Sequence, residues 1–200
     1  MLSRKVIKKI YADFENEGDG ALVRRGITKS DQELLDPFVS LVEFSVSPPG
    51  GFKDHPHRGF ESVTYMLQGG IIHQDFNGNK GTIHEGGVQW MTAGRGIIHS
   101  EMPEEQVNKG IEPKNLDMSS SEIPRSEEYG VETVPESWTA FAYIIEGDEG
   151  VFSSSDSSTV QAHNVVVFGT GDEVSVWNTS SSRSLRFLLI AGEPIGEPVV

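Results

Sequence analysis

The 200-residue sequence has no cysteine and no apolar run near the roughly 20 residues that a membrane-spanning helix needs. Without cysteine it forms no disulfide and offers no thiolate to a metal, and this absence fits a reducing compartment. The N-terminal sequence MLSRKVIKKI also has no apolar segment of the kind that signal peptides carry. These absences predict a protein that is neither secreted nor embedded in a membrane.

Basic residues are scarce over most of the chain, whose formal net charge is −14. Residues 1–30 hold seven basic and four acidic side chains, so the remaining nine basic and 26 acidic side chains give residues 31–200 a net charge of −17. Nucleic-acid binding draws its affinity from Lys and Arg that neutralise phosphates. We therefore expect no direct contact with nucleic acid, and binding to DNA only through another protein.

Short apolar runs separated by glycine fill the sequence from about Leu41 to Glu101 and return after Trp138. Regular short strands with turn residues between them are typical of β-sandwiches and barrels, so the expected fold class is all-β. Residues 101–136 hold ten acidic and three basic side chains, a composition that favours a linker over strands. The predicted domains are therefore residues 1–110, an acidic linker or crossover at 111–137, and a second, partial domain at 138–200.

Two pairs of side chains with alternating spacing, His55 with His57 and His99 with Glu101, are the strongest candidates for a site. Successive side chains of a β-strand point to opposite faces, so each pair places both of its groups on one face. Three imidazoles and a carboxylate suit iron, manganese, nickel, copper or zinc. Pro56 has no N–H, so the strand that carries the first pair must be an edge strand or a bulge.

The other ionisable residues near these pairs have weaker claims to a role. Glu61 could present a carboxylate on the same face as His57, although a solvent-exposed charge explains it equally well. His73, His84 and His163 have no partner at metal-ligand spacing, so we expect surface or hydrogen-bonded histidines there.

The spacing of these residues approximates the two cupin motifs, which are carried here by Gly51, His55, His57, Glu61 and Gly69, followed by Gly87, Gly94, Gly96 and His99. Longer strings resemble the pirin family: DPFVSLVEF, GGFKDHPHRGFESVTYMLQGG, GGVQWMTAGRGIIHSEMP and LIAGEPIGEPVV. The resemblance spans nearly all of the strand-like sequence, and DHPHRGFE with QWMTAGRGIIHSEMP is specific to that family.

Resemblance to pirins implies a bicupin: two β-barrel domains, the first holding one iron and the second mostly inert. The four ligands of the family fall on His55, His57, His99 and Glu101, and other divalent metals could take the place of iron. Four protein ligands would leave two open positions in an octahedral shell. Glu101 is then also the candidate general base, and no further cofactor is implied.

Two functions follow from the resemblance. The first is an iron-binding nuclear protein, present also in the cytoplasm, that acts as a transcriptional coregulator through transcription-related or signalling partners. The second is a flavonol (quercetin) 2,3-dioxygenase, which would make a flavonoid the small-molecule ligand. The sequence does not decide whether the protein is an enzyme, and a truncated inactive paralogue or splice form is a third interpretation.

Departures from the family pattern are the basis of that third interpretation. Pirins continue after Met102-Pro103 with an apolar strand, carry further strands before the stretch that contains Trp138, and extend beyond Val200. We therefore expect part of the first barrel and the opening strands of the second to be missing, with a gap after the strand that bears His99 and Glu101, and reduced stability as the result.

Overall fold

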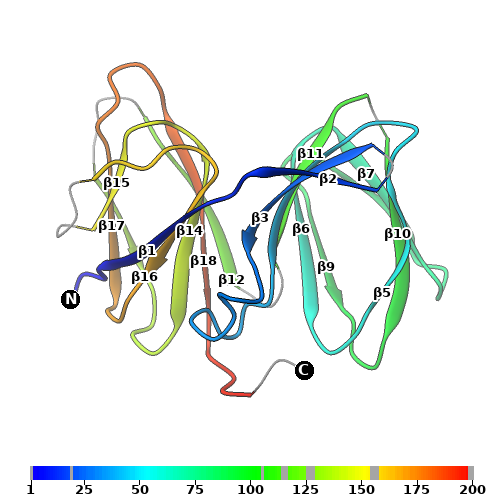
Figure 1. Ribbon diagram of the computed structural model, residues 1–200, viewed down its shortest axis with the longest axis horizontal. Helices are drawn as coiled ribbons and strands as arrows, with labels where there is room; N and C mark the ends of the chain where they lie inside the picture. The colour runs from blue at the N-terminus through cyan, green and yellow to red at the C-terminus, as the bar shows by residue number, and fades with distance from the viewer. Residues whose placement is uncertain are drawn as a thin grey trace. The chain divides into compact units, whose positions relative to one another are not determined.

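The computed structural model describes residues 2–18, 20–104, 106–113, 117–124, 129–153 and 158–197. These residues form strands and turns and no helix, which confirms the all-β prediction (Figure 1). Accordingly, the described residues include no helix that is long and apolar enough to cross a membrane. The chain divides into two compact units. The N-unit comprises Asp13–Thr28 and Ser40–Asn115, and the C-unit comprises Met1–Ala12, Lys29–Val39 and Leu116–Val200.

The N-unit contains two antiparallel sheets whose inner faces share one apolar core. The larger sheet has the order β2 (Phe14–Glu17), β3 (Ala21–Ile27), β4 (Leu41–Val46), β11 (Asn108–Pro113), β6 (Glu61–Gln68), β9 (Val88–Thr92). The smaller sheet has the order β5 (Phe52–His57), β10 (Ile97–Pro103), β7 (Gly70–Asp75), β8 (Lys80–His84).

The core of the N-unit fills one end of the space between these sheets. It is formed by alternate residues of β3, β4, β6, β7 and β8, namely Ala21, Val23, Phe44, Val46, Met66, Ile71 and Ile83. Because only alternate residues of a strand face inward, the outward positions can remain polar, as Arg24 and Glu43 are. The opposite end of the interior is left to polar residues, and the candidate site lies there.

The C-unit has the same all-β character. Its larger sheet has the order β1 (Val6–Tyr11), β16 (Asn164–Phe168), β14 (Thr139–Glu146), β18 (Leu185–Gly192), β12 (Asp117–Ile123). Its smaller sheet has the order β13 (Tyr129–Thr133), β17 (Glu173–Asn178), β15 (Gly150–Phe152).

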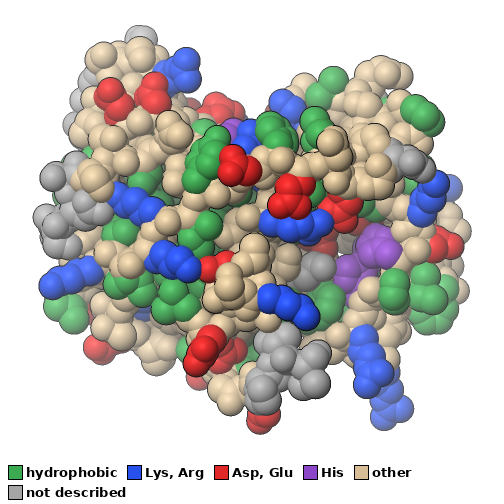
Figure 2. Space-filling model, viewed as in Figure 1, with side chains coloured by type: hydrophobic (Ala, Val, Ile, Leu, Met, Phe, Trp, Pro, Cys, Tyr) green, Lys and Arg blue, Asp and Glu red, His purple; other side chains and the backbone are tan. Residues whose placement is uncertain are grey.

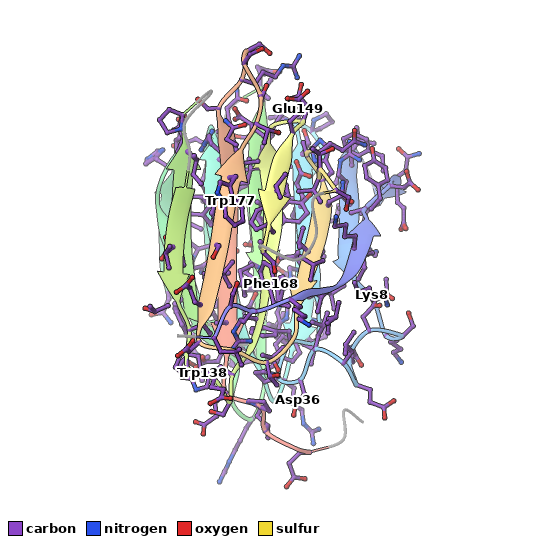
Figure 3. All side chains as sticks on the ribbon, turned by 90° about the vertical axis from the view of Figure 1, so that its left-hand side faces the viewer. Lys8, Asp36, Trp138, Glu149, Phe168 and Trp177 are labelled. Atoms are coloured by element: carbon purple, nitrogen blue, oxygen red, sulfur yellow. The ribbon has the colours of Figure 1, made fainter. Side chains whose placement is uncertain are left out.

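Apolar side chains pack the interior of the C-unit. Phe152 makes an edge-on contact with Phe187, with ring centroids 5.3 Å apart, and a tilted contact with Phe168. Val176 belongs to the same core, whereas the neighbouring Trp177 points to the other face of β17 (Figure 3).

The stretch predicted to be a linker, residues 111–137, contains strands instead. Strands β12 and β13 lie within it, and β11 crosses its first boundary. Strand β11 pairs with β4 on one side and with β6 on the other, so the gap predicted after the strand that bears His99 and Glu101 is not present. Pairing on both sides compensates for the poor intrinsic strand propensity of its Asn, Gly, Glu and Pro residues.

Two residues explain how β11 fits into the sheet. Asn108 is fully buried, where its Oδ1 accepts a hydrogen bond from Gly70 N at 3.0 Å and its Nδ2 donates to Val46 O at 3.1 Å. At Gly110, a Cβ atom would lie 2.5 Å from Phe44 Cζ, so the ring of Phe44 occupies the space that a side chain would need. The residues that look unsuitable for a strand are the ones that this position requires.

The unit boundaries also differ from those that the sequence predicts. Residues 1–12 fall in the C-unit, where β1 extends the larger sheet by pairing with β16, and Arg4 is buried with Nη1 2.9 Å from Gly169 O. The sequence-based assignment of residues 1–110 to one domain followed chain order, whereas strand pairing joins segments that are far apart. Among the described residues the C-unit has eight strands and the N-unit ten.

Candidate metal centre

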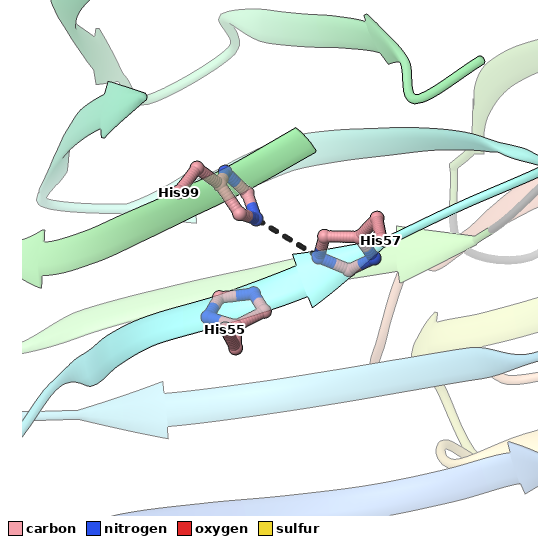
Figure 4. Close-up of side chains that lie close together, drawn as sticks. All are labelled: His55, His57 and His99. Carbon is pink, nitrogen blue, oxygen red and sulfur yellow. Dashed lines mark hydrogen bonds between the residues drawn. The ribbon is translucent and has the colours of Figure 1, made fainter. Parts of the chain in front are cut away.

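Three histidines converge in the N-unit from two neighbouring strands. His55 and His57 lie on β5, and His99 lies opposite His55 on the antiparallel strand β10. Strand β5 is the edge of its sheet, as the proline between the two histidines predicts. Alternation along β5 and the register with β10 together direct the three rings to the same place (Figure 4).

The imidazole nitrogens lie at distances that suit a shared metal ion. One ligand nitrogen from each of the three residues lies within 4.8 Å of the others, and His57 Nε2 is 2.9 Å from His99 Nε2. With metal–nitrogen bonds of about 2.1 Å, two adjacent ligands of an octahedral site lie roughly 3 Å apart. His57 and His99 are buried, with 6% and 3% of their surface exposed, so water competes little for their nitrogens.

A backbone contact fixes the tautomer of His55. Its Nδ1 lies 2.8 Å from Lys53 O, and a carbonyl oxygen can only accept, so Nδ1 carries the proton and donates it. The lone pair is then on Nε2. Metal-binding histidines usually make this kind of second contact, which orients the ring and raises the basicity of the ligating nitrogen.

Glu101 lies beside His99 but is not part of the grouping of three histidines that could hold a metal. It follows His99 by two residues on β10, so both side chains point to the same face, and its Oε2 is 4.0 Å from His99 Nε2. Its Oε1 accepts a hydrogen bond from Thr64 Oγ1 at 3.3 Å, and only 4% of the residue is exposed. A carboxylate at this position could join the histidines in holding a metal ion.

The donor set therefore fits a first-row divalent metal. Imidazole nitrogens suit iron, nickel, copper and zinc alike, and the buried carboxylate adds a hard oxygen donor that suits iron or manganese. The converging histidines confirm that a metal could bind here, while the choice of iron stays a prediction. The assignment of His55, His57, His99 and Glu101 as ligands also stays a prediction.

A cavity of about 450 Å³ opens beside this centre, and His55, His57 and Glu101 lie in its wall. Its apolar wall includes Val23, Val42, Phe44 and Phe52, and its polar wall includes Glu17, Arg25, Ser40, Lys53 and Glu112. Figure 2 shows histidine side chains (purple) in a hollow of the surface, where Figure 1 draws β5, β9 and β10. A small molecule could therefore reach the histidines from solvent.

The remaining candidates do not join the cluster. Glu61 Oε1 accepts a hydrogen bond from Thr92 Oγ1 at 2.8 Å. The exposed His84 lies 3.3 Å from Glu104, and burial lowers the pKa of His73 below its usual value, partly offset by Asp75. His163 takes a left-handed backbone conformation with φ 67°. Among the described residues, the grouping that could hold a metal contains none of these four.

Two residues that the sequence did not single out also lie at the site. Thr64 holds Glu101, and Ser62 donates a hydrogen bond to Glu112 from the same face of β6. Alternation along β6 could have placed Ser62 and Thr64 on one face. Their partners could not be inferred, because these depend on the pairing of β6 with β11 and on β10, which belongs to the other sheet.

The two units, each built from antiparallel sheets, with histidines converging from neighbouring strands of one unit, define a bicupin with a candidate metal site. Family models agree: the model described as Pirin matches residues 22–118, and the model of the Pirin C-terminal cupin domain matches residues 121–200. Pirin-1 of Arabidopsis thaliana is 61% identical over 98% of this chain and 86% of its own length. Pirin of Homo sapiens is 37% identical over 99% of this chain and 86% of its own length. The chain belongs to the pirin family.

Solved structures share the fold at low sequence identity. The GK1651 protein of Geobacillus kaustophilus superposes with a TM-score of 0.85 at 24% identity, covering 99% of both chains. A quercetin 2,3-dioxygenase from Acinetobacter baumannii superposes with a TM-score of 0.84 at 21% identity, covering 99% of this chain and 90% of its own chain. The bacterial pirin YhhW of Escherichia coli, in complex with nickel(II), gives 0.75 at 17% identity, covering 92% and 96%. These likenesses confirm the bicupin fold.

The comparisons also confirm that this chain is shorter than its relatives. The alignment with Pirin-1 runs over 246 positions, 46 more than the 200 residues of this chain, so at least 46 positions of that relative have no counterpart here. The relative therefore has internal segments that this chain lacks, as the sequence predicts.

Proposed function

We propose that this protein is a metal-dependent dioxygenase that opens flavonols, of the quercetin 2,3-dioxygenase type, with one metal held by His55, His57, His99 and Glu101. The observation that carries the proposal is that two of the three clustered histidines, His55 and His57, lie in the wall of a cavity that a small molecule can enter. The Acinetobacter enzyme of similar fold, named for quercetin, suggests the substrate class.

A bound divalent metal would supply a Lewis acid for a chelating substrate oxygen and the redox capacity that chemistry with dioxygen needs. The protein's own part is to hold that ion, exclude bulk water and accept a proton. Glu101 is placed for the last task, because Thr64 fixes its Oε1 while its Oε2 points towards the histidines. A carboxylate within hydrogen-bond reach of a substrate hydroxyl can act as general base.

The cavity also suits a flat aromatic substrate. Its volume of about 450 Å³ falls in the range of small-molecule sites, roughly 300–1,000 Å³. The rings of Phe44 and Phe52, with centroids 5.5 Å apart, give an aromatic side to the cavity that His55 also lines. Aromatic rings gain from stacked or edge-on contact with such a wall.

The test is metal analysis of the purified chain followed by oxygen uptake with quercetin. We expect about one equivalent of metal, uptake that depends on quercetin, and loss of both in His57→Ala. His84→Ala is the matched control, because His84 is exposed and outside the cluster. A fully loaded protein that consumes no oxygen with any flavonol would contradict the proposal.

We propose a coregulator that acts through protein partners as the second candidate, on the evidence of one surface. Val88 and Trp90 point to one face of the edge strand β9, and each is 50% exposed. Exposed apolar side chains on an edge strand favour a protein partner. Capture of a defined nuclear protein should depend on the iron oxidation state and be weakened by Trp90→Ala; capture that neither change affects would argue against this function.

A further inference from the structure

We propose that Glu112 selects the substrate by accepting a hydrogen bond from a second hydroxyl group of a polyhydroxylated aromatic molecule whose first hydroxyl lies at the metal centre. This inference rests on the proposed function and assigns to the same cavity a specificity-determining residue. Glu112 lies on β11, in the stretch where the sequence predicts a linker rather than a wall of the site.

The register of the larger sheet places Glu112 inside the barrel. Val42 on β4 pairs with Glu112 on one side and with Arg25 of β3 on the other, and all three residues line the cavity. The next row inward consists of Val23, Phe44 and Gly110, which are apolar or lack a side chain. Glu112 thus lies directly above an apolar floor, at the level where the interior becomes polar.

Two hydroxyl side chains of β6 each donate a hydrogen bond to one carboxylate of the cavity wall. Thr64 donates to Glu101 and Ser62 donates to Glu112, and both donors are buried. Residues two apart on a strand point to one face and lie roughly 7 Å from each other. Glu101 and Glu112 both line the cavity, each held by its own hydroxyl donor, and Glu101 also lies 4.0 Å from His99 Nε2.

Two aromatic rings line the same cavity as these carboxylates. Phe44 packs over Gly110 and meets Phe52 edge-on, with an angle of 81° between the ring planes. A flat molecule lying on these rings would present its edge to the polar wall. A substrate with hydroxyl groups at both ends could then reach Glu101 with one and Glu112 with the other.

The carboxylate of Glu112 is a suitable hydrogen-bond acceptor for a phenolic hydroxyl group. A carboxylate oxygen can accept more than one hydrogen bond, so Glu112 can accept a substrate O–H alongside the bond from Ser62. A hydrogen bond to a charged acceptor is about twice as strong as a neutral one. Losing it should weaken binding roughly 10- to 100-fold for a ligand that uses it.

The experiment compares two flavonols on the metal-loaded full chain: quercetin, and 3-hydroxyflavone, which keeps the chelating 3-hydroxyl and 4-carbonyl but lacks the other hydroxyls. Binding is measured anaerobically by fluorescence titration, and metal content is measured in parallel. The wild type should bind quercetin about 10- to 100-fold more tightly than 3-hydroxyflavone. Glu112→Gln should lose most of this preference while it keeps its metal and its affinity for 3-hydroxyflavone.

Two further variants keep the test decisive. Ser62→Ala removes the hydrogen bond that holds Glu112 and should reduce the preference partly, which covers the case in which Glu112→Gln does not fold. Glu85→Gln removes the same charge from an exposed turn and should leave binding of both flavonols unchanged.

The outcomes separate this inference from the proposed function. A wild-type preference that disappears in Glu112→Gln supports the role of Glu112 even if no oxygen is consumed, and that second result would overturn only the proposed function. Equal loss of both ligands in Glu112→Gln, or an unchanged preference, would overturn the inference, as would a wild type that binds neither compound. Loss of metal in Glu112→Gln would also overturn the inference, since Glu112 would then ligate the metal or support one of its ligands.

Discussion

His57 Nε2 lies 2.9 Å from His99 Nε2, although the two residues are 42 positions apart in the chain. Strands β5 and β10 bring them together, because His99 lies opposite His55 and His57 is the next residue of β5 on the same face. Two nitrogens at this distance share either a proton or a metal ion. The first prediction distinguishes between these.

Replacing His57 with Ala should remove most of the bound metal. The substitution removes one of three converging imidazoles, and loss of even a supporting contact typically costs 10- to 100-fold in metal affinity, so a lost ligand should cost at least about 100-fold. Metal content after dialysis, measured by mass spectrometry, checks this, with His84→Ala as the control. A variant that keeps a full equivalent would show that His57 is not a ligand.

Thr64→Val should weaken metal binding without abolishing it. The substitution keeps the shape of the side chain and removes the hydroxyl that donates to Glu101 Oε1 at 3.3 Å, so the carboxylate loses its support. We expect a fall of about 10-fold in metal affinity, measured by competition with a chelator. Thr92→Val, which removes the contact with Glu61 outside the cluster, should leave the affinity unchanged. Equal effects of the two substitutions would rule out a specific role for Thr64.

Asn108→Ala should destabilise the N-unit. Asn108 is fully buried, and its removal leaves the amide of Gly70 and the carbonyl of Val46 without this partner. Each buried polar group that is left without a hydrogen bond costs about 1–3 kcal/mol. The free energy of unfolding should therefore fall by roughly 2–4 kcal/mol, measured by urea denaturation. Lys109→Ala, at an exposed position of the same strand, is the control. A loss below about 0.5 kcal/mol would mean that β11 contributes little to the sheet.

Asn79→Ala should raise the pKa of Asp75. Hydrogen bonds to the carboxylate, above all from the Asn79 side chain, hold that pKa below its usual value. A lowered carboxyl pKa adds stability above the unfolded value, about 3.9, and this contribution disappears as the pH falls through the folded value. The difference in stability between wild type and variant should therefore be present at pH 6 and shrink below about pH 4.

Carbon-detected NMR titration of Asp75 measures the pKa directly. Asn77→Ala is the matched control, because Asn77 contacts Asp75 through its backbone N–H at 2.9 Å, which the substitution keeps. Equal pKa values of Asp75 in all three proteins would contradict the assigned cause.

The chain alone should not bind DNA selectively. Its residues 31–200 carry a net charge of −17, which repels phosphate and leaves few cations to neutralise it. A mobility-shift assay near physiological salt should show no sequence-selective complex, whereas a shift that survives excess nonspecific competitor DNA would refute this.

The sequence predicted the candidate site better than its surroundings. Alternation alone places His55 with His57 and His99 with Glu101, because strand geometry has a fixed period of two residues. Family resemblance added the bicupin fold and the convergence of the two strands. Neither could place Glu112, whose position depends on the pairing of β11 with β4, which joins residues far apart in the chain.

The acidic stretch of residues 101–136 shows why composition is a poor guide to strands here. Asn108 and Gly110 have low strand propensity, yet each makes a contact that a typical strand former could not: two backbone hydrogen bonds in one case, room for a ring in the other. Such residues are selected by their neighbours in the folded protein, and a sequence window does not contain those neighbours.

The alternation of the chain between its two units limits how this protein can be divided or recombined. Five successive segments, 1–12, 13–28, 29–39, 40–115 and 116–200, belong in turn to the C-unit and the N-unit. No single cleavage releases either unit intact, and a deletion of the first twelve residues would strip an edge strand from the C-unit. A chimera that exchanges one barrel with a relative would need four junctions, one at each point where the chain passes from one unit to the other.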